Sequence, residues 1–374
     1  MNFASDVYWL ALPRVRGVGP RVARVLLERL GEAPAIFAAG ENDLVAAGIY
    51  RTTARNLLQF DGFARLEQEL CELQRLGGRL VRWSDPDYPA NLREIADPPP
   101  VLYLLGTLTA GERDCVAVVG ARSASDAGRH MARRLGLELA AKGITVVSGL
   151  ARGIDSEAHH GALEAGGRTL AVMGSGLDRI YPQEHRKLAE LMVARGGALL
   201  SELPLGSPPV PENFPVRNRI IAGLCLGVVV VEAAEQSGSL ITARRALEQN
   251  RQVFAVPGSP LTGKARGSNR LLKEGARLVE CVEDVIEDLA PQLSGRRVPP
   301  APAASPARAP ASAKVSEQLR AVVDHLPPGE KVHIDAIVES SGLSAQIILR
   351  MLLELELAGM VIQHPGKLFS LSQA

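Results

Sequence analysis

The feature of this sequence that most constrains its fold is a regular alternation of short apolar runs with helical stretches after residue 115. The runs are continuous in Val, Leu, Ile and Ala, as expected of strands that helices bury on both faces. Such alternation predicts a doubly wound α/β sheet. The runs are residues 115–120, 143–149, 169–176, 198–204, 227–233, 252–259 and 276–282.

The segments that follow these runs are small, polar or arginine-bearing. Ligands bind beyond the carboxyl ends of the strands in such sheets, so these segments are the expected binding edge. Glycine permits close backbone approach, free N–H groups at helix starts attract anions, and arginine matches phosphate oxygens in pairs. A phosphodiester strand could contact many such loops in succession. The segments are residues 120–123, 148–153, 174–176, 237–239 and 257–259.

Two arginines, Arg217 and Arg219, lie in a stretch without Asp or Glu between Glu212 and Glu232. We therefore expect unpaired positive charge beside the buried strand that follows. Residues 261–273 extend this charge with four basic residues and no acidic one. The four are Lys264, Arg266, Arg270 and Lys273.

Phe214 precedes this arginine pair and allows two interpretations. Its ring could stack on an unpaired base, or it could pack back on its own helix as a hydrophobic staple. The sequence leaves both open. Aromatic residues make up only 4% of the chain, so we expect contacts to the nucleic-acid backbone to dominate over base stacking.

Composition limits the remaining functions. The net charge is +1, from 42 basic and 41 acidic residues, so any anion site must be local. The four cysteines contain no C-x-x-C pair, which predicts neither a metal site nor a disulfide framework. No apolar run is long enough for a membrane helix, and the first residues lack the basic region of a secretory signal, so we expect a cytoplasmic protein.

A nicotinamide cofactor is not predicted. The first strand is followed by GARSASDAG instead of G-x-G-x-x-G, and the second strand ends in Ser148-Gly149 instead of an acidic residue. Gly174 and Gly176 fit a structural turn equally well. Loop carboxylates could supply an acid and a base, but caps and arginine partners are the favoured interpretation. These carboxylates are Asp155, Asp178, Glu202, Glu232 and Glu235.

Four segments are predicted. Residues 1–77 form short helices around the Gly17–Gly19 turn. This turn could contact DNA or simply join packed helices. Residues 1–75 hold nine basic and nine acidic residues. Residues 78–290 form the α/β domain, beginning with an extended passage over 80–105. Residues 291–314 are a Pro/Ala-rich linker. Residues 315–374 have a winged-helix pattern, with a net charge of −3 that argues against strong duplex binding.

Several motifs in the α/β domain together resemble the DprA/Smf family of DNA-processing proteins. They are SGLARGIDSEAHHGAL, AVMGSGLDRIYP, FPVRNRIIAGL, VVEAAEQSGSLITARRALEQNRQVFAVPG and GSNRLLKEGA. The resemblance implies an extended Rossmann-like, mostly parallel sheet with a small helical N-terminal domain of helix-hairpin-helix or SAM-like type. It also implies single-stranded DNA binding, a homodimer, and loading of the RecA recombinase in natural transformation, without catalysis, cofactor, metal or membrane. The family's first loop usually ends in Tyr-Gly, whereas this chain has Ala127-Gly128.

The resemblance and the loop pattern together give one predicted site for single-stranded DNA. Its residues are Arg122, Ser148, Gly149, Arg152, Gly174, Gly176, Phe214, Arg217, Asn218, Arg219, Ser237, Gly238, Ser239, Lys264, Arg266 and Asn269.

The alternative function is a nucleotide-processing enzyme like the phosphoribohydrolases, which share a similar fold. Their Gly-Gly-x-Gly-Thr turn is followed by a glutamate three residues after the threonine. If Thr242 is the matching threonine, that position here is Arg245. A cation cannot replace the carboxylate as acid or base, so the sequence favours binding over hydrolysis.

Overall fold

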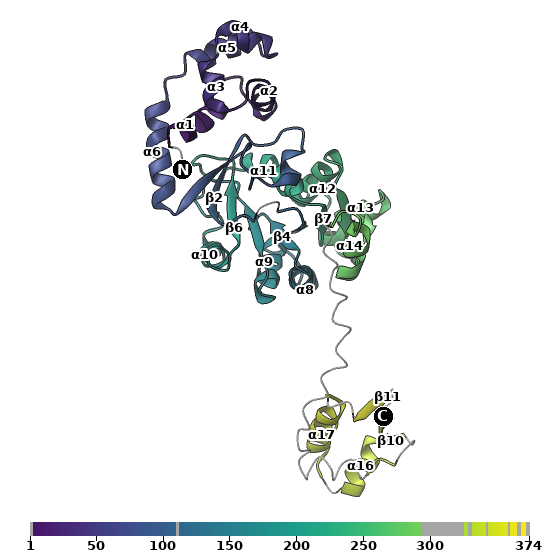
Figure 1. Cartoon of the computed structure of the whole chain (residues 1–374). Coiled ribbons are helices and arrows are strands. Elements are labelled where there is room, and N and C mark those ends of the chain that lie inside the picture. The colour runs from purple at the N-terminus through teal and green to yellow at the C-terminus, as the bar shows by residue number, and fades with distance from the viewer. Residues whose placement is uncertain are drawn as a thin grey trace. The chain divides into compact units, whose positions relative to one another are not determined.

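The computed structural model describes residues 3–109, 112–293, 325–327, 331–341, 343–357, 360–364 and 368–371 (Figure 1). The chain divides into two compact units, Met1–Arg297 and Val298–Ala374. Among the described residues, no helix is both long and apolar enough to cross a membrane. The predicted linker lies outside the described residues from residue 294 onward.

The first unit begins with a group of short helices. Gly17, at a φ of 94°, turns the chain before α2, and a Cβ there would lie 2.6 Å from Oγ1 of Thr53. The turn is therefore packed against a neighbouring helix. Trp9, Leu26 and Ile36 are buried at the centre of the group. The elements are α1 (Phe3–Ala11), η1 (Leu12–Arg14), α2 (Pro20–Leu30), α3 (Ala33–Ala38), α4 (Glu41–Ala46), α5 (Arg51–Leu58) and α6 (Phe63–Arg75).

A nine-stranded sheet follows, in the order β1-β2-β6-β5-β4-β3-β7-β8-β9. The strands β3 to β9 pair in parallel, as the apolar runs predict. The passage over residues 80–105 instead supplies β1 and β2, which are antiparallel to their neighbours at one edge. The strands are β1 (Gly78–Arg82), β2 (Val101–Gly106), β3 (Cys115–Val119), β4 (Thr145–Ser148), β5 (Thr169–Val172), β6 (Ala198–Ser201), β7 (Gly227–Val230), β8 (Gln252–Ala255) and β9 (Arg277–Leu278).

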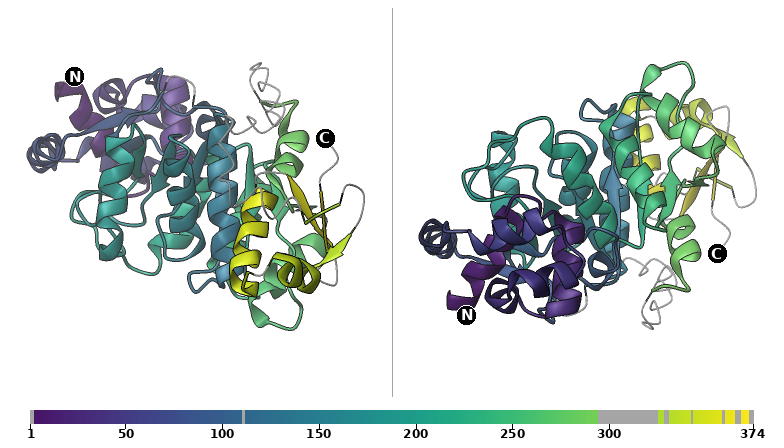
Figure 2. Two further views of the ribbon diagram at one scale, coloured as in Figure 1. Left: turned by 90° about the horizontal axis from the view of Figure 1, so that it is seen from below. Right: turned by 90° about the horizontal axis from the view of Figure 1, so that it is seen from above.

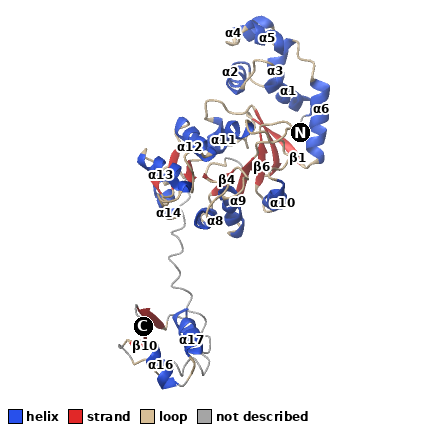
Figure 3. Cartoon of the chain, turned by 180° about the vertical axis from the view of Figure 1, so that it is seen from behind, coloured by secondary structure: helices blue, strands red, loops and turns tan. Residues whose placement is uncertain are grey.

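Helices cover both faces of the sheet (Figures 2 and 3), which explains the continuous apolar runs. In β7, Val228 and Val230 join the core on one face, whereas Val229 joins the core on the other. One face carries α7 (Ala90–Arg93), α11 (Asn213–Leu224), α12 (Gly238–Glu248) and α13 (Arg266–Lys273). The other carries α8 (Asp126–Ala141), α9 (Ile154–Glu164), α10 (Arg186–Ala194) and α14 (Val282–Leu289).

The strand order reverses between β3 and β7. From β3 the parallel strands β4, β5 and β6 extend to one side, and β7, β8 and β9 extend to the other. At such a reversal the loops that leave the two central strands diverge, which opens a crevice beyond their carboxyl ends. The topology therefore places a crevice between the loop after β3 and the loop after β7.

The second unit is small and has its own core. Ile337 on α16 (Ile334–Ser341) and Leu352 on α17 (Ala345–Leu357) pack with Phe369 of a three-stranded antiparallel sheet. Its strands are β10 (Val332–His333), β11 (Val361–His364) and β12 (Leu368–Leu371). Strands β11 and β12 pair antiparallel within the predicted winged-helix segment, and residues 365–367 between them lie outside the described part.

Candidate nucleic-acid interface

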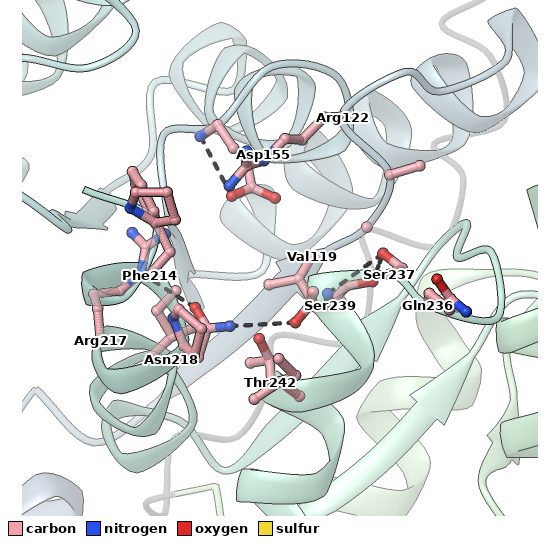
Figure 4. Close-up of a pocket in the computed structure, with 18 of the residues that line it drawn as sticks. Val119, Arg122, Asp155, Phe214, Arg217, Asn218, Gln236, Ser237, Ser239 and Thr242 are labelled. Carbon is pink, nitrogen blue, oxygen red and sulfur yellow. Dashed lines mark hydrogen bonds between the residues drawn. The ribbon is translucent and has the colours of Figure 1, made fainter. Parts of the chain in front are cut away.

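A cavity of about 670 Å³ lies at the reversal of strand order (Figure 4). Most of its wall comes from residues 119–123 at the end of β3 and just after it, the start of α9, the first half of α11, and residues 234–242 leading into α12; Tyr181, Pro209 and Pro211 complete it. Three of the loops that the sequence identifies, after β3, β4 and β7, therefore meet at one site. In Figure 4, Phe214, Arg217 and Asn218 face Ser239 and Thr242 across the cavity.

Arg217 on α11 is the central cation of this wall. Its side chain is buried, and Nη1 donates to the carbonyl oxygens of Gly149, at 3.0 Å, and Val172. Within the described ranges no carboxylate is hydrogen-bonded to it, and the nearby charge of Asp155 is the acidic group that favours its charged form. Burial lowers the pKa of Arg217 to about 10, so it is still charged at neutral pH. A buried charge without an ion pair is costly, and a bound anion would offset that cost.

Asp155 fixes the loop that faces Arg217. It lies in the first turn of α9, and its Oδ2 accepts hydrogen bonds from the backbone N–H groups of Gly149, at 3.0 Å, and Ala151, at 3.4 Å. Burial raises its pKa, while the charge of Arg217 lowers it. The carboxylate thus holds the loop before α9 in place, whereas the sequence-based interpretation was a cap on the N–H groups of the helix itself.

Phe214 lines the cavity between two guanidinium groups. The Cζ atom of Arg122 lies 5.2 Å from the ring centroid, and that of Arg217 lies 5.8 Å from it. The ring also rests on Gly174, where a Cβ would lie 2.7 Å from a ring carbon. Tyr181 packs beside the ring with centroids 5.8 Å apart. Tyr181 is a cavity residue that the loop pattern does not predict; its one signal in the sequence is an aromatic residue just beyond the 174–176 turn.

The opposite wall offers hydroxyl and backbone groups at the start of α12. Ser237 caps this helix: its Oγ accepts from the Ser239 backbone N–H at 3.4 Å and lies 2.8 Å from the Ser239 Oγ. Asn218 donates across the cavity to the Gly238 carbonyl at 3.3 Å. The N-terminus of a helix favours anions. This wall therefore complements the two arginines.

The prediction that Arg219 is an unpaired phosphate contact is wrong. Its Nη2 donates to both carboxylate oxygens of Glu202, at 2.5 and 2.6 Å, and its Nε lies 3.6 Å from Asp97. The side chain is buried away from the cavity, so two acidic groups from distant parts of the sequence neutralise it. Arg219 holds α11 to the sheet instead.

Ser148 and Gly176 are also absent from the cavity wall. The hydroxyl of Ser148 is buried and donates to the Val118 carbonyl at 2.6 Å. A Cβ on Gly176 would lie 2.6 Å from the Pro204 carbonyl, so this glycine serves a packed turn. Both positions shape the loops without facing the space between them.

Arg152 lies next to the cavity on the surface. It forms a two-point ion pair with Glu184, with distances of 2.6 and 2.8 Å, and both side chains are more than half exposed. The hydrogen bond to Glu184 raises the pKa of Arg152. Exposed pairs of this kind contribute little stability and exchange partners easily.

The three predicted residues after β8 lie apart from this cavity. Lys264 lines a second cavity of about 660 Å³, and Arg266 is exposed at the start of α13. Asn269 holds the preceding loop: its side-chain amide accepts from the Gly258 N–H at 3.0 Å and donates to the Gly258 carbonyl at 2.8 Å.

Comparison with known proteins identifies the family. Residues 79–290 match the family model described as DNA recombination-mediator protein A. The chain belongs to this family. Residues 300–367 match the DprA winged helix domain, which confirms the predicted winged helix together with the predicted family.

Relatives and solved structures agree. The chain is 41% identical over 327 residues to Protein Smf of Escherichia coli, with 86% of each chain covered. It is 46% identical over 206 residues to the DNA processing protein DprA of Streptococcus pneumoniae, covering 54% of this chain and 72% of the relative. The X-ray structure of the latter protein matches with a TM-score of 0.64 at 35% identity, over 77% and 98% of the two chains.

A second solved structure bears on the ligand. DNA processing protein A of Helicobacter pylori, solved in a study of its single-stranded DNA binding mode, matches with a TM-score of 0.51 at 28% identity. The match covers 57% of this chain and 96% of the relative. The fold class predicted from the alternating runs, with its helical N-terminal part, is thereby confirmed.

Proposed function

We propose that this protein binds single-stranded DNA without regard to sequence, through phosphates held at the cavity between the β3 and β7 loops. The observation that carries the proposal is the buried guanidinium of Arg217, which faces the cavity without an ion pair in the described part of the chain. The H. pylori relative, which was solved in a study of its single-stranded DNA binding mode, supports the same ligand.

The geometry suggests a division of roles. Arg122 is exposed and Arg217 is buried, so the first would meet a phosphate from the solvent side and the second from below. The hydroxyl groups of Ser237 and Ser239 would complete the phosphate's hydrogen bonds. Phe214 and Tyr181 would support an adjacent base by stacking, which every base permits. None of these contacts reads the edge of a base, so binding would be independent of sequence.

The remaining parts of the proposal rest on family membership. We infer that the protein forms a homodimer in the cytoplasm and helps load the RecA recombinase during natural transformation. No catalysis and no cofactor is needed for this role. The nucleotide-processing alternative is disfavoured because Arg245, at the position where those enzymes carry a glutamate, is exposed and paired with Glu248 at 2.7 Å.

The proposal is tested by titrating a labelled oligo-dT strand, and a duplex of equal length, with the full chain at several salt concentrations. We expect the logarithm of the single-strand binding constant to fall linearly with the logarithm of the salt concentration. The slope should steepen by about 0.7 for each phosphate contact. Parallel incubation with nucleoside monophosphates should release no base. Base release without strand retention, or strand binding that salt does not weaken, would contradict the proposal.

A further inference from the structure

The second cavity lies on the opposite side of the sheet edge from the first. Its walls come from the start of α8 and from the segments after β7, β8 and β9. The first cavity is walled mainly by α11 and α12, which cover the other face, and also by the start of α9. At about 660 Å³ the second cavity is as large as the first, and both fall in the range of small-ligand sites.

Two loops separate the cavities and contribute to both. After β3, residues 120–123 line the first cavity, whereas Ser125 and Gly128 line the second. After β7, Glu232 lines the second, and residues 236–239 line the first. The Glu232 carboxylate fastens the loops together by accepting from the N–H of Ser125, at 3.1 Å, and from its hydroxyl, at 2.5 Å. This junction of Ser125 with Glu232 therefore joins two loops that each contribute residues to both cavities.

The second cavity differs from the first in chemistry. Its inner wall is apolar, with Met131, Val231, Val256 and Val279. Two acidic residues belong to this wall: Glu232 is buried, which disfavours a phosphate inside, and Glu280 is exposed to solvent. The basic residue of this wall, Lys264, is exposed to solvent. An apolar interior with a cation at the solvent side suits a planar base inside and its phosphate outside.

We propose that this cavity takes an unstacked base of the strand whose phosphates occupy the first cavity, while Lys264 pairs with the adjoining phosphate. The inference rests on the proposed function and adds a second base-binding position to it. The chain's own connectivity supports this occupant, because the loops after β3 and β7 carry residues of both cavities. Ala127, exposed in the first turn of α8, leaves the entrance open.

The test compares oligo-dT with a strand of the same length that has the phosphates and sugars but no bases. Ala127→Phe places a ring at the cavity entrance, and His130→Phe places the same ring on an exposed position of α8 outside either cavity. We expect Ala127→Phe to weaken oligo-dT binding roughly fivefold or more, since each stacked base contributes substantially. Its affinity for the base-free strand, and both affinities of His130→Phe, should equal those of the unmodified protein.

Lys264→Gln supplies a second test that does not depend on filling the cavity. The slope of log affinity against log salt should be smaller by about 0.7 for both strands, because the substitution removes one phosphate contact. Equal oligo-dT affinity for Ala127→Phe and His130→Phe, or equal weakening of both strands by Ala127→Phe, would overturn the inference. If Arg122→Gln and Arg217→Ala also leave binding unchanged, the proposed function fails as well, so the two failures are distinguishable.

Discussion

The guanidinium groups of Arg122 and Arg217 converge on one aromatic ring, with their Cζ atoms 5.2 and 5.8 Å from the centroid of Phe214. The two arginines come from the loop after β3 and from α11, nearly a hundred residues apart. Burial lowers the pKa of Arg217, the charge of Asp155 raises it, and the charge of Arg122 lowers it further. A phosphate bound between the two arginines would offset their mutual repulsion.

Replacing Phe214 separates base stacking from charge. Phe214→Leu should weaken single-strand binding by about 1–3 kcal/mol, because base stacking on an aromatic ring contributes that amount. Phe214→Tyr keeps the ring and should bind like the unmodified protein. Fluorescence anisotropy over a salt series measures both quantities. A changed salt slope in Phe214→Leu would contradict the stacking role.

Removing Glu184 should strengthen DNA binding. In the free protein the Glu184 carboxylate forms an ion pair with the guanidinium of Arg152 and would compete with a DNA phosphate for it. We expect Glu184→Gln to tighten single-strand binding a few-fold at low salt, and Arg152→Gln to weaken it. Glu28→Gln is the matched control, because Glu28 forms a similar surface ion pair with Arg24 on α2, distant in the chain from Glu184. Equal affinities of Glu184→Gln and Glu28→Gln would show that Arg152 plays no part.

Glu202 and Arg219 are expected to govern stability instead of binding. Glu202→Ala leaves the buried Arg219 with only Asp97, at 3.6 Å, and should lower the free energy of unfolding by about 3 kcal/mol. The double variant Glu202→Leu with Arg219→Met removes both charges and should recover much of that loss. Chemical denaturation measures the effect. A loss in the double variant as large as in Glu202→Ala would contradict a buried charge as its cause.

His159 predicts how stability depends on pH. It is fully buried, bonded through Nδ1 to the Thr169 hydroxyl at 2.6 Å, and burial lowers its pKa from 6.5 to about 3. The unfolded chain therefore binds a proton at a higher pH than the folded protein, so stability is present above pH 6.5 and falls as pH drops below it.

Between pH 7.5 and 5.5 the free energy of unfolding should fall by about 1.4 kcal/mol because of this histidine, since pH 5.5 lies one unit below its pKa in the unfolded chain. His159→Gln lacks the titrating group, so its free energy of unfolding should fall less over the same interval. Other groups titrate equally in both proteins and cancel in the comparison. Identical pH dependence of the two proteins would contradict the assignment.

The sequence predicts the parallel sheet well because its signal is local. Val228, Val229 and Val230 pack into the cores on the two faces of the sheet, so all three are apolar. The sequence therefore shows a continuous apolar run. The edge strands β1 and β2 were instead interpreted as an extended passage. Their place in the sheet depends on pairing with β6, more than ninety residues further along, which no local pattern specifies.

The candidate site was predicted less completely, because the sequence gives the position of each residue in the chain but not the direction in which its side chain points. Arg217 and Arg219 are two apart on α11, and residues two apart on a helix do not share a face. This rule could have shown that only one of them reaches the cavity. The partners of Arg219, Asp97 and Glu202, come from outside the stretch that appeared free of acidic residues.

The central claim is that the cavity arginines bind phosphate, and the salt dependence of single-strand affinity tests it most directly. Arg122→Gln changes an exposed residue, Arg217→Ala a buried one, and Arg65→Gln, exposed on α6, is the control for loss of a charge. We predict that each cavity variant binds oligo-dT more weakly at low salt, with a slope of log affinity against log salt smaller by about 0.7, while Arg65→Gln is unchanged. Folded Arg122→Gln and Arg217→Ala proteins with the affinity and slope of the unmodified protein would contradict the account.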